Sequence, residues 1–233
     1  MYTSAEILKY ILMFAIAVFL MFFVPFWLLI RAMGKRTKEM RREAEKLGFN
    51  FIRGGDGAFL QSLKDFSLMD SANVDYSREH NLLKKQENST EITLADLCLR
   101  SSKYRTKVKP PISLTMLSFN ADDLNLPEFY MKPKQMPDKE MPKSDYKDID
   151  FTENSDFSKT YLLHGKDEVA VRNLFNKPGI IDSLEQEEGL CMEGKGRNLI
   201  IYKCVDGAPC IVAAEDFDAF INQGRRIFSI LSE

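Results

Sequence analysis

The feature that most constrains this chain is an uncharged run of 21 residues near its N-terminus, Tyr10 to Ile30 (YILMFAIAVFLMFFVPFWLLI). At the α-helical rise of about 1.5 Å per residue, the run spans about 30 Å, the thickness of the hydrocarbon core of a bilayer. Tyr10 and Trp27 lie near its two ends, where amphipathic rings favour the membrane interface. The run predicts a transmembrane helix, with residues 1–30 forming an N-terminal tail and anchor.

Two other interpretations fit the run less well. A cleaved signal peptide has an apolar region of about 7–15 residues followed by a small-residue cleavage site, and no such site separates Ile30 from the charges that follow it. A helix inside a globular core rarely stays uncharged over such a length in a chain of 233 residues. We therefore expect a permanent single span.

A cluster of basic side chains follows the run at once, whereas only Lys9 precedes it. The cluster consists of Arg31, Lys35, Arg36, Lys38, Arg41 and Arg42. By the positive-inside rule, this asymmetry places the N-terminus outside and the C-terminal domain in the cytoplasm. The six side chains are also predicted to contact the bilayer surface and its anionic lipid headgroups.

Residues 31–47 are predicted to continue as a basic juxtamembrane helix that ends at Gly48, with a narrow apolar stripe of Met40, Ala44 and Leu47. Residues 1–42 hold seven basic and two acidic side chains, a net charge of +5; the remaining 25 basic and 32 acidic side chains give −7 for the rest. Because nucleic acid is bound by basic faces, an acidic body argues against a nucleic-acid partner.

Residues 48–233 are predicted to form a soluble α+β domain. Apolar patterns of strand type occupy residues 49–53, 80–86, 90–102, 109–119, 124–133, 148–151, 159–166 and 189–204. Short connections between them predict a largely antiparallel sheet in which most strands pair with their neighbours in the sequence. Asp56 is expected to cap a short helix with Phe59, Leu63 and Phe66 on one face, and Asp167 to cap another. An amphipathic C-terminal helix over residues 217–231 is expected to close over the sheet. A polar, proline-punctuated stretch at about 133–147 predicts an irregular loop.

The motifs for cofactor and metal chemistry are weak. The GGDG turn at residues 54–57 lacks the spacing of either glycine-rich phosphate-binding fingerprint, so no cofactor is predicted. His80 and His164 lie far apart, without metal-ligand spacing around either. No metal site is predicted.

The cysteine content is ordinary for a reduced cytosolic domain. The four cysteines are Cys98, Cys191, Cys204 and Cys210, and none forms a CxxC pair. Cys191 and Cys204 flank a predicted hairpin around Gly194 and Gly196, but they are not expected to be register partners. A disulfide between Cys204 and Cys210 is geometrically possible.

Several motifs occur in a characteristic order: AEKLGFNF, ADLCLRSS, LPEFYMKP, DIDF, FSKTYLL and LCMEGKGRNLIIYK. In this order, over residues 8–231, the chain resembles an uncharacterised family of prokaryotic single-span, membrane-anchored proteins with a soluble α+β domain. The resemblance implies the same architecture and no particular activity.

Three functional hypotheses follow. The first is a non-enzymatic binding or scaffolding domain, tethered at the cytoplasmic face, with an unidentified protein partner. The second is a membrane-associated enzyme acting on lipid or envelope substrates; its catalytic candidates are Asp96, Asp123, Asp148, Asp150 and His164. Asp96 lies in the middle of a predicted strand, where a solvated strand face is the simpler explanation. The third is an envelope-facing domain with inverted topology.

Overall fold

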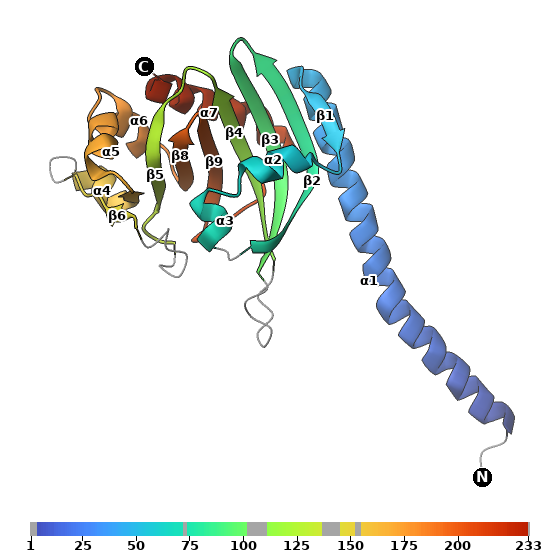
Figure 1. Ribbon diagram of the computed structural model, residues 1–233. Helices are drawn as coiled ribbons and strands as arrows, with labels where there is room; N and C mark the ends of the chain where they lie inside the picture. The colour runs from blue at the N-terminus through green and yellow to red at the C-terminus, as the bar shows by residue number, and fades with distance from the viewer. Residues whose placement is uncertain (1–3, 72–73, 102–110, 137–144, 152–154, 233) are drawn as a thin grey trace.

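The computed structural model describes residues 4–71, 74–101, 111–136, 145–151 and 155–232 (Figure 1). The helices are α1 (Ser4–Leu47), α2 (Gly57–Ser62), α3 (Ser67–Ser71), α4 (Ser155–Thr160), α5 (Glu168–Phe175), α6 (Ile180–Glu185), the 3-10 helix η2 (Ala214–Asp216) and α7 (Phe217–Ser232). The strands are β1 (Asn50–Arg53), β2 (Val74–Glu87), β3 (Thr90–Ser101), β4 (Ile112–Ala121), β5 (Leu126–Pro133), β6 (Lys147–Asp148), β7 (Tyr161–Gly165), β8 (Leu190–Gly196), β9 (Asn198–Val205) and β10 (Ala208–Pro209).

These strands form one sheet in the order β1-β2-β3-β4-β9-β8-β5-β7-β6, with β10 beside β9. Each strand pairing in the described residues is antiparallel, so the predicted α+β class with a largely antiparallel sheet is confirmed. Most pairings join strands that follow each other in the chain, as expected. The exceptions among the described strands are β4, which pairs with β9, and β5, which lies between β8 and β7. Most residues of β8 and β9 are buried, on both faces of the sheet, as is typical of strands whose two faces are both covered.

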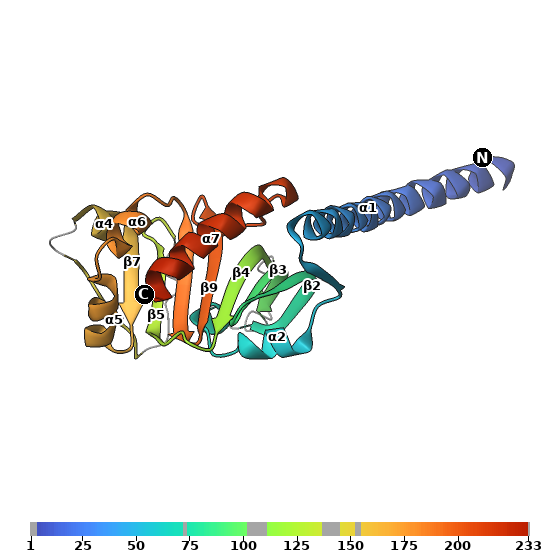
Figure 2. The same ribbon diagram turned by 90° about the horizontal axis from the view of Figure 1, so that it is seen from above.

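The sheet has a hydrophobic core on each face. One core joins the sheet to side chains of α1, α4, α5, α6 and α7. The other joins it to side chains of α2, α3 and the turn between them, and to Met136. Figure 2 shows the same layering, with α7 and the end of α1 on one side of the strands and α2 on the other. The predicted C-terminal helix closing over the sheet is confirmed as α7.

Helix α1 runs without interruption through Pro25 and projects far beyond the body (Figure 1). Near its C-terminal end, Met40 and Ala44 are fully buried against the sheet. The helix ends where Gly48 adopts a φ of +70°, the left-handed conformation of a helix stop that glycine adopts without a Cβ penalty. Among the described residues, no helix has both the length and the apolar character that membrane crossing requires.

Several local predictions need correction. The helix capped by Asp56 ends at Ser62, so Phe66 reaches the core from the turn that follows it. Helices α4 and α6 were not predicted, since each has six residues and so is too short to show a helical period. Gly196 has a positive φ at the β8–β9 turn, as expected, but Gly194 lies within β8, where a Cβ would overlap the Phe129 ring. The loop expected at about 133–147 lies partly outside the described residues.

A substitution at Gly224 tests the packing of α7 on the sheet. A Cβ there would overlap the side chain of Leu117 and lie 3.0 Å from Cε2 of Phe119. We expect Gly224→Val to lower the free energy of unfolding by about 1–3 kcal/mol, the usual cost of overpacking a core. Gly34→Ala is the matched control, because a Cβ at Gly34 meets no atom within 4 Å. The control should raise helix stability by about 0.5–1 kcal/mol. Denaturant unfolding in detergent measures the free energy of unfolding of both variants. Equal changes in the two would contradict the packing of α7 on Leu117 and Phe119.

Glu87, the last residue of β2, ties α7 to the sheet. Its Oε1 lies 2.6 Å from Nη2 of Arg225 and 2.9 Å from Nζ of Lys85. Burial opposes ionisation of Glu87, but the hydrogen bonds from Lys85 and Arg225 outweigh it and lower the pKa below its usual 4.5. A depressed folded-state pKa contributes stability above the unfolded-state pKa, and this contribution is lost as the pH falls through the folded-state value. We therefore expect Glu87→Gln to destabilise the protein at pH 7 by about 1 kcal/mol or less. The deficit relative to wild type should shrink below about pH 4.5 in urea titrations; a pH-independent deficit would contradict the assignment.

Candidate functional site

The candidate site is the junction between α1 and the sheet, and its centre is Asp96 on β3. Asp96 pairs in register with Asn81 on β2 and Thr115 on β4, and it is only 4% exposed. Thr115 donates a hydrogen bond of 2.8 Å from its hydroxyl to Oδ1 of Asp96. A buried carboxylate is costly unless it is paired and hydrogen-bonded, so Asp96 requires a cationic partner.

That partner is Arg36, which reaches Asp96 from α1. Nε of Arg36 donates to Oδ2 at 2.9 Å and Nη2 donates to Oδ1 at 3.0 Å. This bidentate geometry is the strongest common form of an ion pair between side chains. The pair is well shielded, with 20% of the Arg36 side chain and 5% of the Asp96 side chain exposed. The carboxylate of Asp96 therefore holds α1 against the sheet.

The segment that precedes α7 completes the junction. Nη2 of Arg36 also donates to the carbonyl of Val212 at 2.8 Å, while the Val212 N–H donates to the hydroxyl of Thr115 at 3.0 Å. The guanidinium lies 5.0 Å from the centroid of the Phe217 ring, within the range of a cation–π contact. One guanidinium thus joins α1, β3 and the start of α7.

The sequence contains a signal for this junction. Arg36, Met40 and Ala44 follow one another at four-residue intervals, so they lie on one face of a helix. Met40 and Ala44 belong to the predicted apolar stripe, and Arg36 extends the stripe toward the N-terminus. A charged residue in line with a buried stripe indicates a buried partner of opposite charge, and Asp96 is a carboxylate set among apolar strand residues.

The six basic residues expected at the lipid surface have different surroundings. Arg36 has a protein partner instead, and Arg41 lies 5.2 Å from the centroid of the Phe51 ring. The side chain of Lys35 is 78% exposed beside Glu39, and that of Arg42 is 74% exposed beside Glu43. Lys38 is exposed, and the side chain of Arg31 lies outside those described. Lipid contact stays a prediction for the residues other than Arg36.

The five catalytic candidates do not form one site. Asp96 on β3 and His164 on β7 are separated by five strand steps, about 24 Å at 4.8 Å per step. Asp123 is exposed in the turn after β4, and Asp150 is exposed with its carbonyl accepting from Arg172 at 2.8 Å. Only Asp148 and His164 meet, as register partners on β6 and β7.

In this pair, Nδ1 of His164 lies 2.5 Å from Oδ1 of Asp148. The His164 side chain is 2% exposed, whereas that of Asp148 is 72% exposed. The imidazole also stacks on the Tyr130 ring at 6.3 Å between centroids. A carboxylate that orients an imidazole is the arrangement used for proton transfer. Here the buried His164 imidazole also holds the edge strand β6 against β7 through its contact with Asp148.

Sequence reasoning missed two buried charged residues on the face covered by α3. Glu193 is 2% exposed and Lys132 is 0% exposed. The carboxylate of Glu193 accepts hydrogen bonds from the backbone N–H groups of Ser67 at 2.6 Å and Leu68 at 2.8 Å. Glu193 therefore fixes the start of α3 on the sheet. The sequence does contain a signal for both residues, because a charged residue lies inside each of the apolar strand segments LCMEG and FYMKP.

Tyr130 on β5 pairs in register with His164 on β7 and with Glu193 on β8. Burial raises the pKa of Tyr130 well above 10, and burial likewise raises that of Tyr202. Both phenols are therefore neutral hydrogen-bonding groups at physiological pH. Within the described ranges, no three His, Cys, Asp or Glu side chains are placed to hold a metal ion.

Fold and junction together define a class: an α+β body joined rigidly to a long N-terminal helix. No protein-family model matches the chain, and no curated protein matches it. Among solved structures, the chain is similar to the crystal structure of the mycobacterial trehalose monomycolate transport factor A, TtfA. The TM-score is 0.57 at 11% identity, and the match covers 87% of this chain and 93% of that one. The likeness shows a shared fold.

Proposed function

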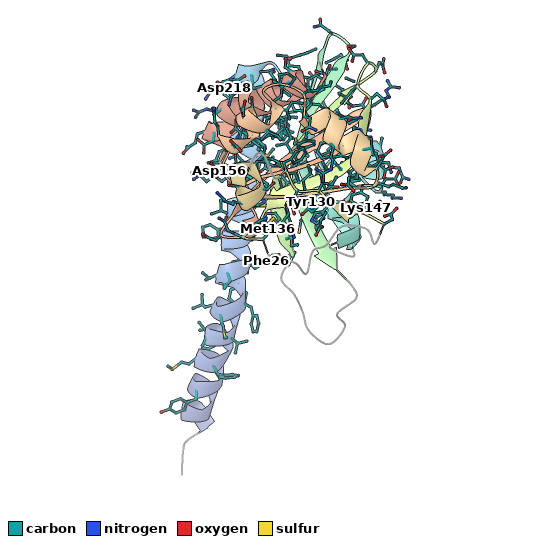
Figure 3. The ribbon with its side chains drawn as sticks, turned by 90° about the vertical axis from the view of Figure 1, so that its left-hand side faces the viewer. Phe26, Tyr130, Met136, Lys147, Asp156 and Asp218 are labelled. Atoms are coloured by element: carbon teal, nitrogen blue, oxygen red, sulfur yellow. The ribbon has the colours of Figure 1, made fainter. Side chains whose placement is uncertain are left out.

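We propose that this chain is a single-pass membrane protein whose body (residues 48–233) is a non-enzymatic binding or scaffolding domain at the cytoplasmic face. The uncharged run Tyr10–Ile30 supports the anchor. The exposed fractions of Phe14, Met21 and Phe22 on α1 are 73%, 72% and 70%. Figure 3 shows side chains around and beyond Phe26 projecting away from the body. Contiguous apolar side chains exposed in this way favour a lipid environment.

The observation that carries the proposal is the continuity of α1 from this apolar half into the Arg36–Asp96 junction. Arg36 lies six positions after Ile30, a distance of about 9 Å along a helix. With no flexible linker and a bidentate ion pair at its base, α1 holds the sheet at a fixed height and orientation above the bilayer. Such an arrangement suits presentation of a binding surface to other membrane components, at a raised effective concentration.

The neighbouring fold is in keeping with this role. TtfA is named as a mycobacterial trehalose monomycolate transport factor, and by analogy of fold we propose that this body acts as a binding factor in a transport process at the membrane. Its partner on this proposal is a membrane-associated protein.

Photo-crosslinking in intact cells tests the binding role. A photoreactive amino acid is placed at exposed body positions such as Lys64 and Asp123, and crosslinked membrane proteins are identified after solubilisation. We expect a reproducible partner that is retained when residues 1–30 are replaced by an unrelated span. Recovery of the same proteins when an unrelated soluble domain carrying the photoreactive amino acid replaces the body would contradict a specific partner.

A second candidate function is an enzyme acting on lipid or envelope substrates, and the Asp148–His164 pair is the observation in its favour. On that hypothesis, Asp148→Asn abolishes the cellular function, because the imidazole loses its orienting carboxylate. The binding proposal predicts that Asp148→Asn retains function, since Asp148 is exposed at the sheet edge. A deletion strain complemented with each variant distinguishes the two.

A further inference from the structure

Three sulfur atoms meet inside the core beneath α2 and α3. Cys191 on β8 and Cys204 on β9 have their Sγ atoms 2.6 Å apart. Sδ of Met136 lies 3.4 Å from the first and 3.3 Å from the second. Cys191 is 0% exposed, Cys204 is 7% exposed and Met136 is 2% exposed. The pair is therefore enclosed by protein on this face of the sheet.

The register explains how two cysteines that are not strand partners come together. Cys191 pairs with Tyr202, so Cys204 lies two residues further along β9, on the same face and in the diagonal position. In this diagonal position the two side chains turn toward each other, so that their sulfurs meet. The N–H of Cys204 donates to the carbonyl of Gly189 at 2.7 Å, which fixes the backbone of both strands around the pair. The expectation that Cys191 and Cys204 are not register partners is confirmed, but it did not exclude contact.

We propose that Cys191 and Cys204 form an intramolecular disulfide when the protein meets a disulfide oxidant. The bond joins β8 to β9 at the centre of the sheet, and it requires the two sulfurs to approach by about 0.6 Å, to the covalent distance of about 2.05 Å. The inference is independent of the binding role. The proposed disulfide joins two cysteines that the sequence alone did not connect. It replaces the Cys204–Cys210 disulfide that the sequence allowed.

The chemistry is ordinary thiol–disulfide exchange. The thiolate of Cys204 attacks one sulfur of a small disulfide such as oxidised glutathione, forming a mixed disulfide and releasing one thiolate. The thiolate of Cys191 then attacks Sγ of Cys204, forming the Cys191–Cys204 bond and releasing the second thiolate. The two protons from the cysteines pass to the released thiolates, and the two electrons that the protein loses reduce the oxidant to two thiols.

The order of attack follows from the surroundings. Cys204 retains some exposure, whereas Cys191 has none. Burial, with the neighbouring Cys204 sulfur, raises the pKa of the Cys191 thiol well above 9, so Cys191 is a poor first nucleophile. Once Cys204 carries the mixed disulfide, Cys191 is already in contact with the sulfur that it must attack.

The test uses the full chain, purified in detergent and incubated with excess oxidised glutathione at about pH 8, where thiolates become available. A second incubation contains urea below the unfolding midpoint, which gives the oxidant access to the hairpin. Each sample is acid-quenched, denatured and alkylated, and its peptides are identified by mass spectrometry. We expect Cys191 and Cys204 to disappear together from the alkylated pool and to appear as one crosslinked peptide pair.

Two variants sharpen the result. Cys210→Ser should retain the crosslink, whereas Cys191→Ser should leave Cys204 either alkylated or as a glutathione adduct. A Cys204–Cys210 crosslink in the wild type would overturn the proposal. So would alkylation or glutathione adducts at both Cys191 and Cys204 in the two incubations, because the contact would then be unproductive even with access.

Discussion

Replacing Phe19 and Leu20 together by arginine will release the protein from the membrane fraction. The two residues lie in the middle of the uncharged run and are 59% and 51% exposed on α1. An arginine at the centre of a spanning helix costs about 2.5–3.5 kcal/mol on insertion scales, so two cost about 5–7 kcal/mol. That penalty is large enough to shift a spanning helix from mostly inserted to mostly excluded.

The measurement is carbonate extraction of cell membranes, followed by sedimentation and immunodetection of the chain in pellet and supernatant. Exchange of the same two residues, Phe19→Leu with Leu20→Phe, is the matched control, because it keeps the volume and the apolar character. We expect the control to remain in the pellet. A double-arginine variant that also stays in the pellet would show that residues 10–30 do not hold the protein in the membrane.

Replacing Asp96 by alanine will destabilise the body strongly. The change leaves the guanidinium of Arg36, which is only 20% exposed, without its counter-charge. It also removes the acceptor for the Thr115 hydroxyl. Deleting one partner of a buried ion pair typically costs 3–5 kcal/mol, and we expect about 3 kcal/mol here because Arg36 keeps some contact with solvent. Denaturant unfolding of the full chain in detergent measures the loss.

Two further variants separate the buried pair from charge effects in general. Lys35→Ala removes an exposed i,i+4 pair with Glu39, and it should change the free energy of unfolding by about 0.5 kcal/mol or less. Replacing both partners, Arg36→Met with Asp96→Leu, should recover most of the loss, since apolar replacements of a buried pair are often neutral. If Asp96→Ala were no more costly than Lys35→Ala, α1 would not depend on this junction.

Local patterns in the sequence were enough to predict most of the fold's elements. The cap at Asp167 accepts a hydrogen bond from the N–H of Ala170, and α7 follows its apolar period. The β8–β9 hairpin was found from its apolar segments on either side of Gly196. These features depend on residues close together in the chain, so propensity and periodicity report them directly.

The strand order and the site depend on contacts that local patterns do not report. Asp96 was interpreted most simply as part of a solvated strand face, but it is only 4% exposed. Its partner Arg36 lies 60 residues away, and Val212 lies 176 residues from Arg36. The basic residues after the anchor were interpreted together as lipid-facing, because position relative to a membrane is the simplest reason for such a cluster. Arg36 lies on the same face of α1 as Met40 and Ala44, and the other basic residues do not. This difference separates a protein contact from a lipid contact only once the sheet is known to pack against that face.

The measurement that tests the central claim most directly is thiol labelling of intact cells with a membrane-impermeant maleimide. The reporter is Lys64→Cys, at an exposed position of the body, in a Cys98→Ser, Cys210→Ser background that leaves only the two buried cysteines. Ser4→Cys in the same background reports the N-terminal side. We predict that Ser4→Cys is labelled in intact cells and that Lys64→Cys is labelled only after lysis. Labelling of Lys64→Cys in intact cells would contradict the cytoplasmic body and support the envelope-facing topology.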